Sequence, residues 1–269
     1  MVAINYELNV IFFHIPKTAG SYIQQKLGRH YNFFNFNDLA RFDNIYENIH
    51  NFYDTSMGVI NNSHIDIFTT NPWSDKSLGI NKYFCTSKKL IKMMSLNKEI
   101  WDKMFKFTFV RCPYSRFISS WNFIIKGFKS DKSIIKSIFL DNNITLQENI
   151  NKMKEIEYFI ENRHQLTDIA YNHVFITQYQ HILNEDNVNN MDFIGKLENL
   201  EEDLKTVLNK IGISEICHNK GEKVNKSDHE PYKTYYNQNI FNFVNSYFDE
   251  DFKHFNYVKY NTFEEFMQE

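Results

Sequence analysis

The chain has 269 residues, of which 42% are hydrophobic, enough to bury a full core in one domain and to exclude a disordered or fibrous protein. The formal net charge is −3, so the molecule as a whole has no positive field that would attract nucleic acid. Three cysteines, without the Cys/His spacing of a zinc site, exclude a disulfide framework and indicate reduced thiols.

The N-terminus contains no recognisable targeting segment. It lacks a basic region, and its apolar run is too short for a signal peptide. No later stretch reaches the roughly 18 consecutive apolar residues that a membrane-spanning helix needs. We therefore expect a cytoplasmic protein without a transmembrane segment.

The first predicted element is a strand at Val10–Phe13, a continuous apolar run typical of a strand that is buried on both faces. It leads into the loop His14–Ser21 and then into a helix that we expect to stop at Gly28, because glycine suits the left-handed conformation at a helix C-terminus. From Arg29 to about Asn81 the pattern indicates only loops and short elements.

A second strand and helix follow in the middle of the chain. The segment Lys88–Lys103 is predicted to be helical, and Phe105–Val110 is predicted to be a strand. Pro113 stands where a helix can begin, because the missing N–H of proline costs nothing in the first turn. Apolar residues of this helix recur at helical spacing, and four polar residues share its other side: Ser115, Ser119, Asn122 and Lys126. We therefore expect the serines to face away from the core.

The remaining chain alternates helices with short strands. The predicted elements are a mainly helical insertion at Ser130–Tyr171, strands at His173–Thr177 and Met191–Gly195, an amphipathic helix at Leu197–Ile211 that ends at Gly212, and final helices from about Tyr235 to Phe252. The absence of repeats and low-complexity linkers favours a single domain over residues 1–269. This order predicts an α/β fold, with a central parallel sheet flanked by helices and with helical and loop insertions. Ligands of such sheets bind beyond the C-terminal ends of the strands.

The motif His14-Ile-Pro-Lys-Thr-Ala-Gly-Ser21 has the features of an anion-binding loop. A loop between a buried strand and a helix N-terminus presents backbone N–H groups and the positive end of the helix dipole. Lys17 adds a positive charge, and the hydroxyl groups of Thr18 and Ser21 can donate hydrogen bonds. Small residues let the backbone approach an anion closely: Thr18, Ala19, Gly20 and Ser21. The motif is not a Walker A sequence, in which the lysine follows the last glycine. An ordinary strand–turn–helix is the alternative.

A second candidate anion site is the motif Arg111-Cys-Pro-Tyr-Ser-Arg-Phe-Ile-Ser119. Arg111 follows a predicted strand, and Ser119 lies two turns into the next helix. A guanidinium and a hydroxyl in this arrangement can hold one phosphate through charge-assisted hydrogen bonds of about 1.5–3 kcal/mol each. We expect Arg116 to add to the same field. The alternative is that Arg111 forms a structural salt bridge and Ser119 is a solvated helix residue.

The two segments HIPKTAGS and FKFTFVRCPYSRFISSWNF together resemble the nucleotide-binding signatures of the carbohydrate sulfotransferases. The first is similar to the 5′-phosphosulfate loop of that family and the second to its 3′-phosphate motif. The resemblance continues in the same order through Ile100–Phe109, Asp192–Leu204 and Asn225–Tyr257. It implies a P-loop-type sulfotransferase fold, 3′-phosphoadenosine 5′-phosphosulfate (PAPS) as donor, 3′-phosphoadenosine 5′-phosphate (PAP) as product, and a carbohydrate or glycoconjugate acceptor. No metal is implied.

The resemblance also implies roles for individual residues. The 5′-phosphosulfate would be held by Lys17, Thr18, Ala19, Gly20 and Ser21, and the 3′-phosphate by Arg111 and Ser119. Lys226 is a weaker candidate for closing over the nucleotide, and the alternative is that it is a solvated loop lysine. Sulfuryl transfer resembles loose in-line phosphoryl transfer, so the protein mainly positions reactants and stabilises charge on the leaving oxygen. Lys17 is the residue that we expect to stabilise this charge.

The sequence departs from the family at the general base. Related enzymes often have a histidine just before a Thr-Ala-like pair upstream of the arginine strand, and here Tyr83–Ser87 places Phe84 at that position. A base must lie within about 3 Å of the acceptor hydroxyl, and histidine or glutamate would suit. His64, with Asp66 nearby, is the best replacement, against the alternative of a solvated loop histidine.

Two other functions remain open. A nucleotide-dependent kinase on a related P-loop scaffold shares the physics of the loop, although the position of Lys17 disagrees with a Walker A motif. A non-catalytic PAP- or PAPS-binding module that lacks the base is supported by Phe84.

Overall fold

The computed structural model describes residues 2–5, 8–31, 34–35, 98–130, 151–166, 168–184, 186–213 and 230–269. The chain divides into two compact units. The first comprises Met1–Val110 and Gln180–Val224, and the second comprises Arg111–Tyr179 and Asn225–Glu269. The single domain expected over residues 1–269 stays a prediction.

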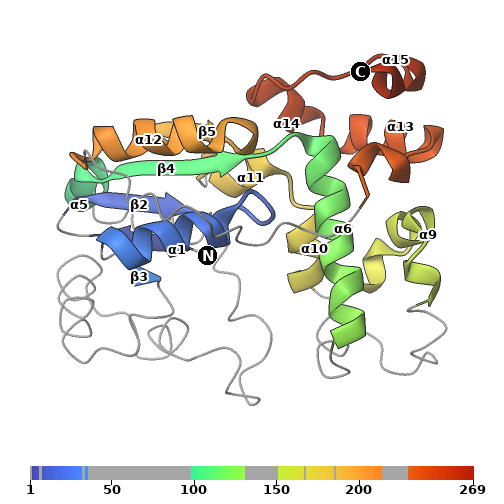
Figure 1. Ribbon diagram of the computed structural model, residues 1–269, viewed down its shortest axis with the longest axis horizontal. Helices are drawn as coiled ribbons and strands as arrows, with labels where there is room; N and C mark the ends of the chain where they lie inside the picture. Colours follow the sequence, from blue (N-terminus) through green and yellow to red (C-terminus); the bar gives the residue numbers. More distant parts are fainter. Residues whose placement is uncertain are drawn as a thin grey trace. The chain divides into compact units, whose positions relative to one another are not determined.

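The first unit is built on a sheet that has five strands within the described residues, in the order β3-β1-β2-β4-β5 (Figure 1). The strands are β1 (Val2–Asn5), β2 (Val10–Phe13), β3 (Phe34–Asn35), β4 (Phe105–Val110) and β5 (Phe193–Lys196). The three strands β2, β4 and β5 are parallel, whereas β1 runs antiparallel to β2 and to β3. The predicted α/β fold with a parallel central sheet is confirmed, and β1 is an addition that the sequence did not predict.

One face of this sheet is covered by α1 (Gly20–Tyr31) and α12 (Leu200–Lys210) (Figure 1). Alternate strand residues point to the same face, and here they form one apolar cluster with the two helices: Val10, Phe12, Ile23, Leu27, Phe107, Phe109, Leu204, Val207 and Leu208. The Tyr22 phenol donates to Glu201 at 2.7 Å and links the two helices. Phe13, the next residue of β2 after Phe12, does not belong to this cluster. Its ring contacts Trp101 of α5 (Lys98–Lys103).

The register of the parallel strands brings their C-terminal ends to one edge of the sheet. Phe13 pairs with Thr108, and Val110 pairs with Lys196. The Thr108 hydroxyl donates to the Phe13 carbonyl at 2.6 Å and ties β4 to the end of β2. The loop that begins at His14 therefore starts at the edge where a ligand is expected.

The second unit is helical and has an aromatic core. Within the described residues its longest helix is α6 (Pro113–Ser130), and the others described there are α9 (Ile156–Glu161), η3 (Arg163–Gln165), α10 (Asp168–Val174), η5 (Tyr232–Tyr235), α13 (Gln238–Tyr247), α14 (Asp249–His254) and α15 (Phe263–Gln268). A further helix, α11 (Gln178–Ile182), spans the boundary between the units, and η4 (Leu197–Asn199) precedes α12 in the first unit. Tyr114 and Phe117 of α6 lie in the core with Phe159, Phe241 and other buried residues.

Several predicted elements are confirmed. The strands Val10–Phe13 and Phe105–Val110 have the predicted bounds, and a helix begins at Pro113. The predicted helix Leu197–Ile211 consists of a 3-10 turn followed by α12, and it ends next to Gly212, which has a φ of 79°. Only the part of Lys88–Lys103 from Lys98 onward is described, and that part is helical.

Three local expectations were wrong. Helix α1 continues past Gly28 to Tyr31, because packing of Ile23 and Leu27 outweighs the cost of about 1 kcal/mol for one glycine in a helix. The run His173–Thr177 is not a strand: Val174 ends helix α10, and a short apolar run cannot be assigned from periodicity alone.

The third concerns the serines of α6. Ser115 and Ser119 are 7% and 5% exposed and do not face solvent. A serine can be buried here because its hydroxyl finds a local carbonyl: Ser115 Oγ donates to the Cys112 carbonyl at 3.1 Å.

Candidate functional site

The loop between β2 and α1 has an unusual backbone. Lys17 and Ala19 have φ values of 69° and 63°, whereas Thr18 between them is not in the positive-φ region. Alternation between left- and right-handed conformations turns successive N–H groups toward the same side and forms an anion-binding concavity. The loop therefore has the backbone geometry that the sequence motif predicted only in outline.

Helix α1 adds further donors to this concavity. The N–H of Ile23 donates to the Ala19 carbonyl at 3.1 Å, which makes Ala19 the residue before the first turn. The N–H groups of Gly20, Ser21 and Tyr22 then precede the first intrahelical hydrogen bond and cannot be satisfied by the helix itself. Together with the helix dipole, they favour a negatively charged ligand at this end.

Packing inside the loop explains Gly20. A Cβ atom at this position would lie 1.8 Å from Cδ2 and 2.0 Å from Nε2 of the His14 ring, so only glycine fits against the imidazole. His14 is thus a packed residue at the strand end. The buried Thr18 hydroxyl donates to the Ile15 carbonyl at 2.9 Å and braces the loop, so what Thr18 offers to an anion is its backbone N–H.

The second motif begins at Arg111, directly after β4. Arg111 Nε donates to Ser115 Oγ at 2.9 Å, and the Ser115 hydroxyl in turn donates to the Cys112 carbonyl. Ser119 lies one helical turn beyond Ser115, on the same side of α6. Arg111 and Ser119 were predicted from the motif, whereas the contact of Ser115 with Arg111 was not, although Ser115 follows Arg111 at i+4 spacing.

Arg116 is buried in the first turn of α6, and its expected contribution to the field of the anion site stays a prediction. It is 1% exposed, and its Nη2 donates to the Ile176 carbonyl at 3.1 Å. The pKa of Arg116 is lowered to about 10, chiefly by burial and further by the charge of Arg111, against the opposing effect of Asp251. Arg116 is therefore a buried structural cation of the second unit.

Two more buried polar residues belong to this network, one bound to the Arg111 backbone and the other bound to the first, and neither could be recognised from the sequence. The Gln178 side chain is hydrogen bonded to the Arg111 backbone, and the Asp251 carboxylate is hydrogen bonded to Gln178. Both are 0% exposed. Burial raises the pKa of Asp251, whereas Arg116 and the N–H groups of Gln178 and Tyr179 lower it.

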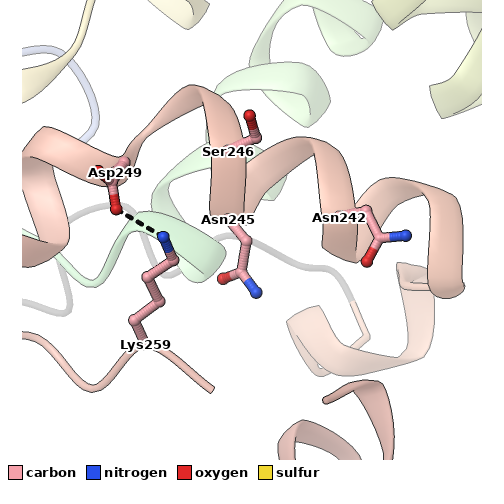
Figure 2. Close-up of a pocket in the computed structure, with 5 residues that line it drawn as sticks. All are labelled: Asn242, Asn245, Ser246, Asp249 and Lys259. Carbon is pink, nitrogen blue, oxygen red and sulfur yellow. Dashed lines mark hydrogen bonds and ion pairs between the residues drawn. The ribbon is translucent and has the colours of Figure 1, made fainter. Parts of the chain in front are cut away.

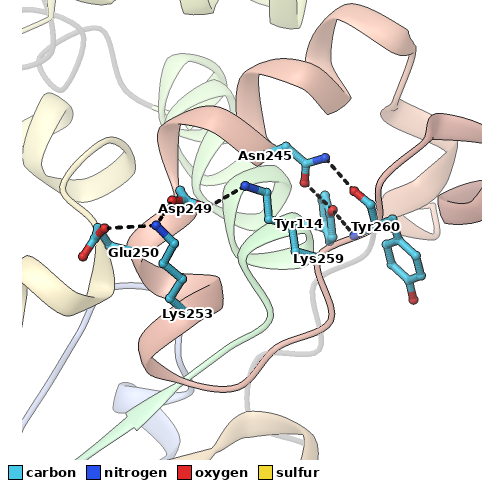
Figure 3. A network of polar contacts seen from close by, with 7 residues as sticks. All are labelled: Tyr114, Asn245, Asp249, Glu250, Lys253, Lys259 and Tyr260. Atoms are coloured by element: carbon cyan, nitrogen blue, oxygen red, sulfur yellow. Dashed lines mark hydrogen bonds and ion pairs between the residues drawn. The ribbon is translucent and has the colours of Figure 1, made fainter.

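The first turn of α6 is anchored by a polar network (Figure 3). Tyr114 Oη donates to Asn245 Oδ1 at 2.5 Å and accepts from the Tyr260 N–H at 3.3 Å, and Asn245 Nδ2 donates to the Tyr260 carbonyl at 3.0 Å. The Tyr236 phenol donates to the Tyr114 carbonyl at 2.9 Å. Burial raises the pKa of Tyr114, which keeps its phenol protonated as a donor. This network fixes the helix that carries Ser115 and Ser119.

A pocket of about 380 Å³ lies elsewhere in the second unit (Figure 2). It is lined by Asn242, Asn245, Ser246, Asp249 and Lys259. Its charged groups already satisfy each other, because Lys259 Nζ donates to Asp249 at 2.5 Å and Lys253 also pairs with Asp249. None of the residues predicted from sequence to form the active site lines this pocket.

Several predicted residues lie outside the described part of the chain. These are the candidate base His64 with Asp66, the position Phe84 within Tyr83–Ser87, and Lys226. Their roles stay predictions. Among the described residues, Lys17–Ser21 follow one another from the end of β2 into α1 in the first unit. In the second unit Arg111 is hydrogen bonded to Ser115, and Ser119 lies one helical turn further along α6.

Within the described ranges, no cluster of three or more His, Cys, Asp or Glu side chains is arranged to hold a metal ion. None of the helices in those ranges combines the length and apolar character needed to cross a membrane.

The fold and the loop define a class of protein: an α/β protein in which a turn with alternating φ signs and a helix N-terminus lie at the C-terminal edge of a parallel sheet, as is typical of anion-binding loops. Comparison with family models identifies the class further, because the model described as the sulfotransferase family matches residues 1–258. The chain therefore belongs to the sulfotransferase family, which transfers sulfuryl groups. No curated protein and no solved structure matched the chain.

Proposed function

We propose that this protein transfers the sulfuryl group of PAPS to a hydroxyl group of a carbohydrate acceptor. The observation that carries the proposal is the backbone of the loop at Lys17–Gly20, where alternating φ signs and the first turn of α1 gather N–H donors beside a lysine. Membership of the sulfotransferase family supplies the reaction class. The carbohydrate acceptor rests on the resemblance of the two nucleotide-binding motifs.

In this proposal the loop Lys17, Thr18, Ala19, Gly20 and Ser21 holds the 5′-phosphosulfate. The acceptor oxygen forms a bond to sulfur while the bond from sulfur to the bridging oxygen breaks. The electron pair of that bond goes to the 5′-phosphate oxygen, and PAP leaves. Lys17 and the N–H groups stabilise this developing charge, and such preorganised donors usually make the largest contribution to catalysis.

The 3′-phosphate is assigned to the second motif. Arg111 and Ser119 bind it, and the hydrogen bond from Arg111 Nε to Ser115 supports the arginine side chain. Lys226 closes over the nucleotide. A 3′-phosphate carries two negative charges at most, and an arginine can bind it through two parallel N–H···O bonds.

The proton of the acceptor hydroxyl goes to His64, which we propose as the general base. General-base catalysis contributes about 10²–10⁴ in rate, so His64→Ala should lower kcat by that order while leaving the affinity for PAP unchanged. An unchanged kcat would assign the base to another residue. A matched change at His254, an exposed residue of α14, should leave kcat as in the wild type.

Nucleotide binding is tested by thermal denaturation with PAP in the absence of magnesium. At 100-fold excess over Kd, a ligand stabilises the native state by about 2.7 kcal/mol. At about 2–4 °C per kcal/mol for a chain of this size, the melting temperature should rise by about 5–10 °C. Lys17→Gln and Arg111→Ala should reduce the rise, and Lys205→Gln, at an exposed position of α12, should not.

Each other outcome has a distinct meaning. No shift with millimolar PAP would refute the proposal. A shift only with ATP and Mg²⁺ would indicate a kinase. Binding of PAP without sulfate transfer to a broad panel of glycans would indicate a non-catalytic nucleotide-binding module.

A further inference from the structure

The backbone of Arg111 is held on both sides by one buried side chain. The Arg111 N–H donates to Gln178 Oε1 at 2.8 Å, and Gln178 Nε2 donates to the Arg111 carbonyl at 2.8 Å. The amide of Gln178 thus makes the same pair of hydrogen bonds that a neighbouring strand would make. Because both backbone groups of one residue are fixed, the direction of its Cα–Cβ bond is fixed as well.

Gln178 is in turn held by a buried carboxylate. Asp251 Oδ2 accepts from the backbone N–H of Gln178 at 3.0 Å and from Gln178 Nε2 at 3.3 Å, and Oδ1 accepts from the Tyr179 N–H at 2.8 Å. These bonds orient the amide so that its oxygen faces the Arg111 N–H. A buried carboxylate is costly unless it is paired and hydrogen bonded, and here the buried cation Arg116 lies near it.

The side chain of Arg111 is fixed at a second point. Its Nε donates to Ser115 Oγ, and Ser115 is itself held by the Cys112 carbonyl. The backbone and the stem of Arg111 are therefore ordered before any ligand arrives. A preordered arginine loses less conformational entropy on binding, and its direction selects where an anion can sit.

We propose that Gln178, oriented by Asp251, is a positioning residue for Arg111, and that this arrangement gives the protein its preference for a nucleotide that carries a 3′-phosphate. This inference rests on the proposed function, in which Arg111 binds that phosphate. In these contacts the Gln178 side chain binds the backbone of Arg111 and the carboxylate of Asp251. Any effect of Gln178 on the ligand is therefore transmitted through Arg111. Removal of the Gln178 side chain should weaken the binding of the 3′-phosphate and leave the binding of the rest of the nucleotide unchanged.

The test compares PAP with adenosine 5′-monophosphate, which differs only by lacking the 3′-phosphate. Isothermal titration calorimetry gives the ratio of the two affinities for wild type, Arg111→Ala, Gln178→Ala and the exposed control Gln238→Ala. Loss of the charge-assisted bonds of Arg111 should lower the ratio on the order of 10- to 100-fold. Gln178→Ala should lower it at least roughly threefold with unchanged affinity for the monophosphate, and Gln238→Ala should leave both affinities unchanged.

A second variant addresses the case in which Gln178→Ala does not fold. In Gln178→Glu the introduced carboxyl group has two oxygens for the Arg111 N–H, but it has a donor for the Arg111 carbonyl only when it is protonated. The preference for PAP should therefore rise in this variant, relative to wild type, as the pH is lowered from about 8 to about 5.5. A role in folding alone would not produce this recovery of the 3′-phosphate preference.

The outcomes separate the two proposals. If wild type does not prefer PAP over the monophosphate, the proposed function fails. If Arg111→Ala abolishes the preference while both Gln178 variants keep the wild-type ratio at all pH values, the positioning role is overturned. It is also overturned if the Gln178 variants lose affinity for both ligands equally, because that result indicates a general structural effect.

Discussion

The substitution Gly20→Ala gives a direct test of the loop geometry. Gly20 has no positive φ, so an alanine meets no backbone strain at this position. It meets the His14 ring instead, because the new Cβ would lie 1.8 Å from Cδ2, 2.0 Å from Nε2 and 2.4 Å from Cγ. Contacts this short require either the imidazole or the loop to move.

The expected cost follows from overpacking. Insertion of a methyl group into a packed site costs about 1–3 kcal/mol. Alanine in place of glycine within a helix returns up to about 1 kcal/mol, which offsets part of that cost. At about 2–4 °C per kcal/mol, Gly20→Ala should lower the melting temperature by up to about 10 °C. The displaced loop should also bind PAP more weakly.

A double-mutant cycle with His14→Ala isolates the cause. If the ring is responsible, Gly20→Ala should be neutral or slightly stabilising in the His14→Ala background, with a coupling energy of about 1–3 kcal/mol. Differential scanning fluorimetry measures the stability of all four proteins, and calorimetry measures their affinity for PAP. The steric role of the His14 ring is refuted if Gly20→Ala matches wild type in both measurements, or if the effects of the two substitutions are additive.

Three further results are expected within the first unit. Thr108→Val removes the buried hydrogen bond to β2 and should destabilise the protein by about 1–2 kcal/mol, as measured by urea denaturation, without changing the affinity for the monophosphate. Gly195→Ala should destabilise it through a contact of 2.5 Å between the new Cβ and the Phe109 ring, and Gly195→Ala combined with Phe109→Leu should recover part of that loss. Burial and the contact with Glu201 raise the pKa of Tyr22 to about 12. The stability that results is fully present below about pH 10 and is lost as the pH rises toward 12. In an NMR titration of the tyrosine ring carbons, Glu201→Gln should lower the pKa of Tyr22, and an unchanged midpoint would contradict the role of Glu201.

The local structure of the motif His14–Ser21 was predictable because it depends on neighbouring residues. A continuous apolar run before His14 predicts a buried strand, and small residues around Lys17 predict a tight turn into a helix. The family could also be recognised, since two short motifs in a fixed order carry it. The opposite φ signs of Thr18 and its neighbours were not predictable, because Lys17 and Ala19 are residue types that ordinarily avoid positive φ.

The surroundings of Arg111 could not be predicted, because they join segments far apart in the chain. Gln178 lies 67 residues beyond Arg111, and Asp251 lies 73 residues beyond Gln178. Nothing in the sequence next to Gln178 or Asp251 distinguishes them from solvated polar residues. The burial of Arg116 could not be predicted for the same reason, because the charge of Asp251 that opposes the cost of burying it comes from a distant segment of the chain.

The sequence alone determined the strands β2 and β4, the start of α6, the turn from β2 into α1 and the sulfotransferase family, because short-range periodicity and motif spacing encode them. Only the tertiary structure decided that Ser115 and Ser119 of α6 are buried, that the His14 ring leaves no room for a Cβ atom at Gly20, and that Gln178, itself bound by Asp251, holds the Arg111 backbone. The physical reason is that burial and hydrogen-bond partners depend on which distant segments pack together, and local sequence carries little information about that packing.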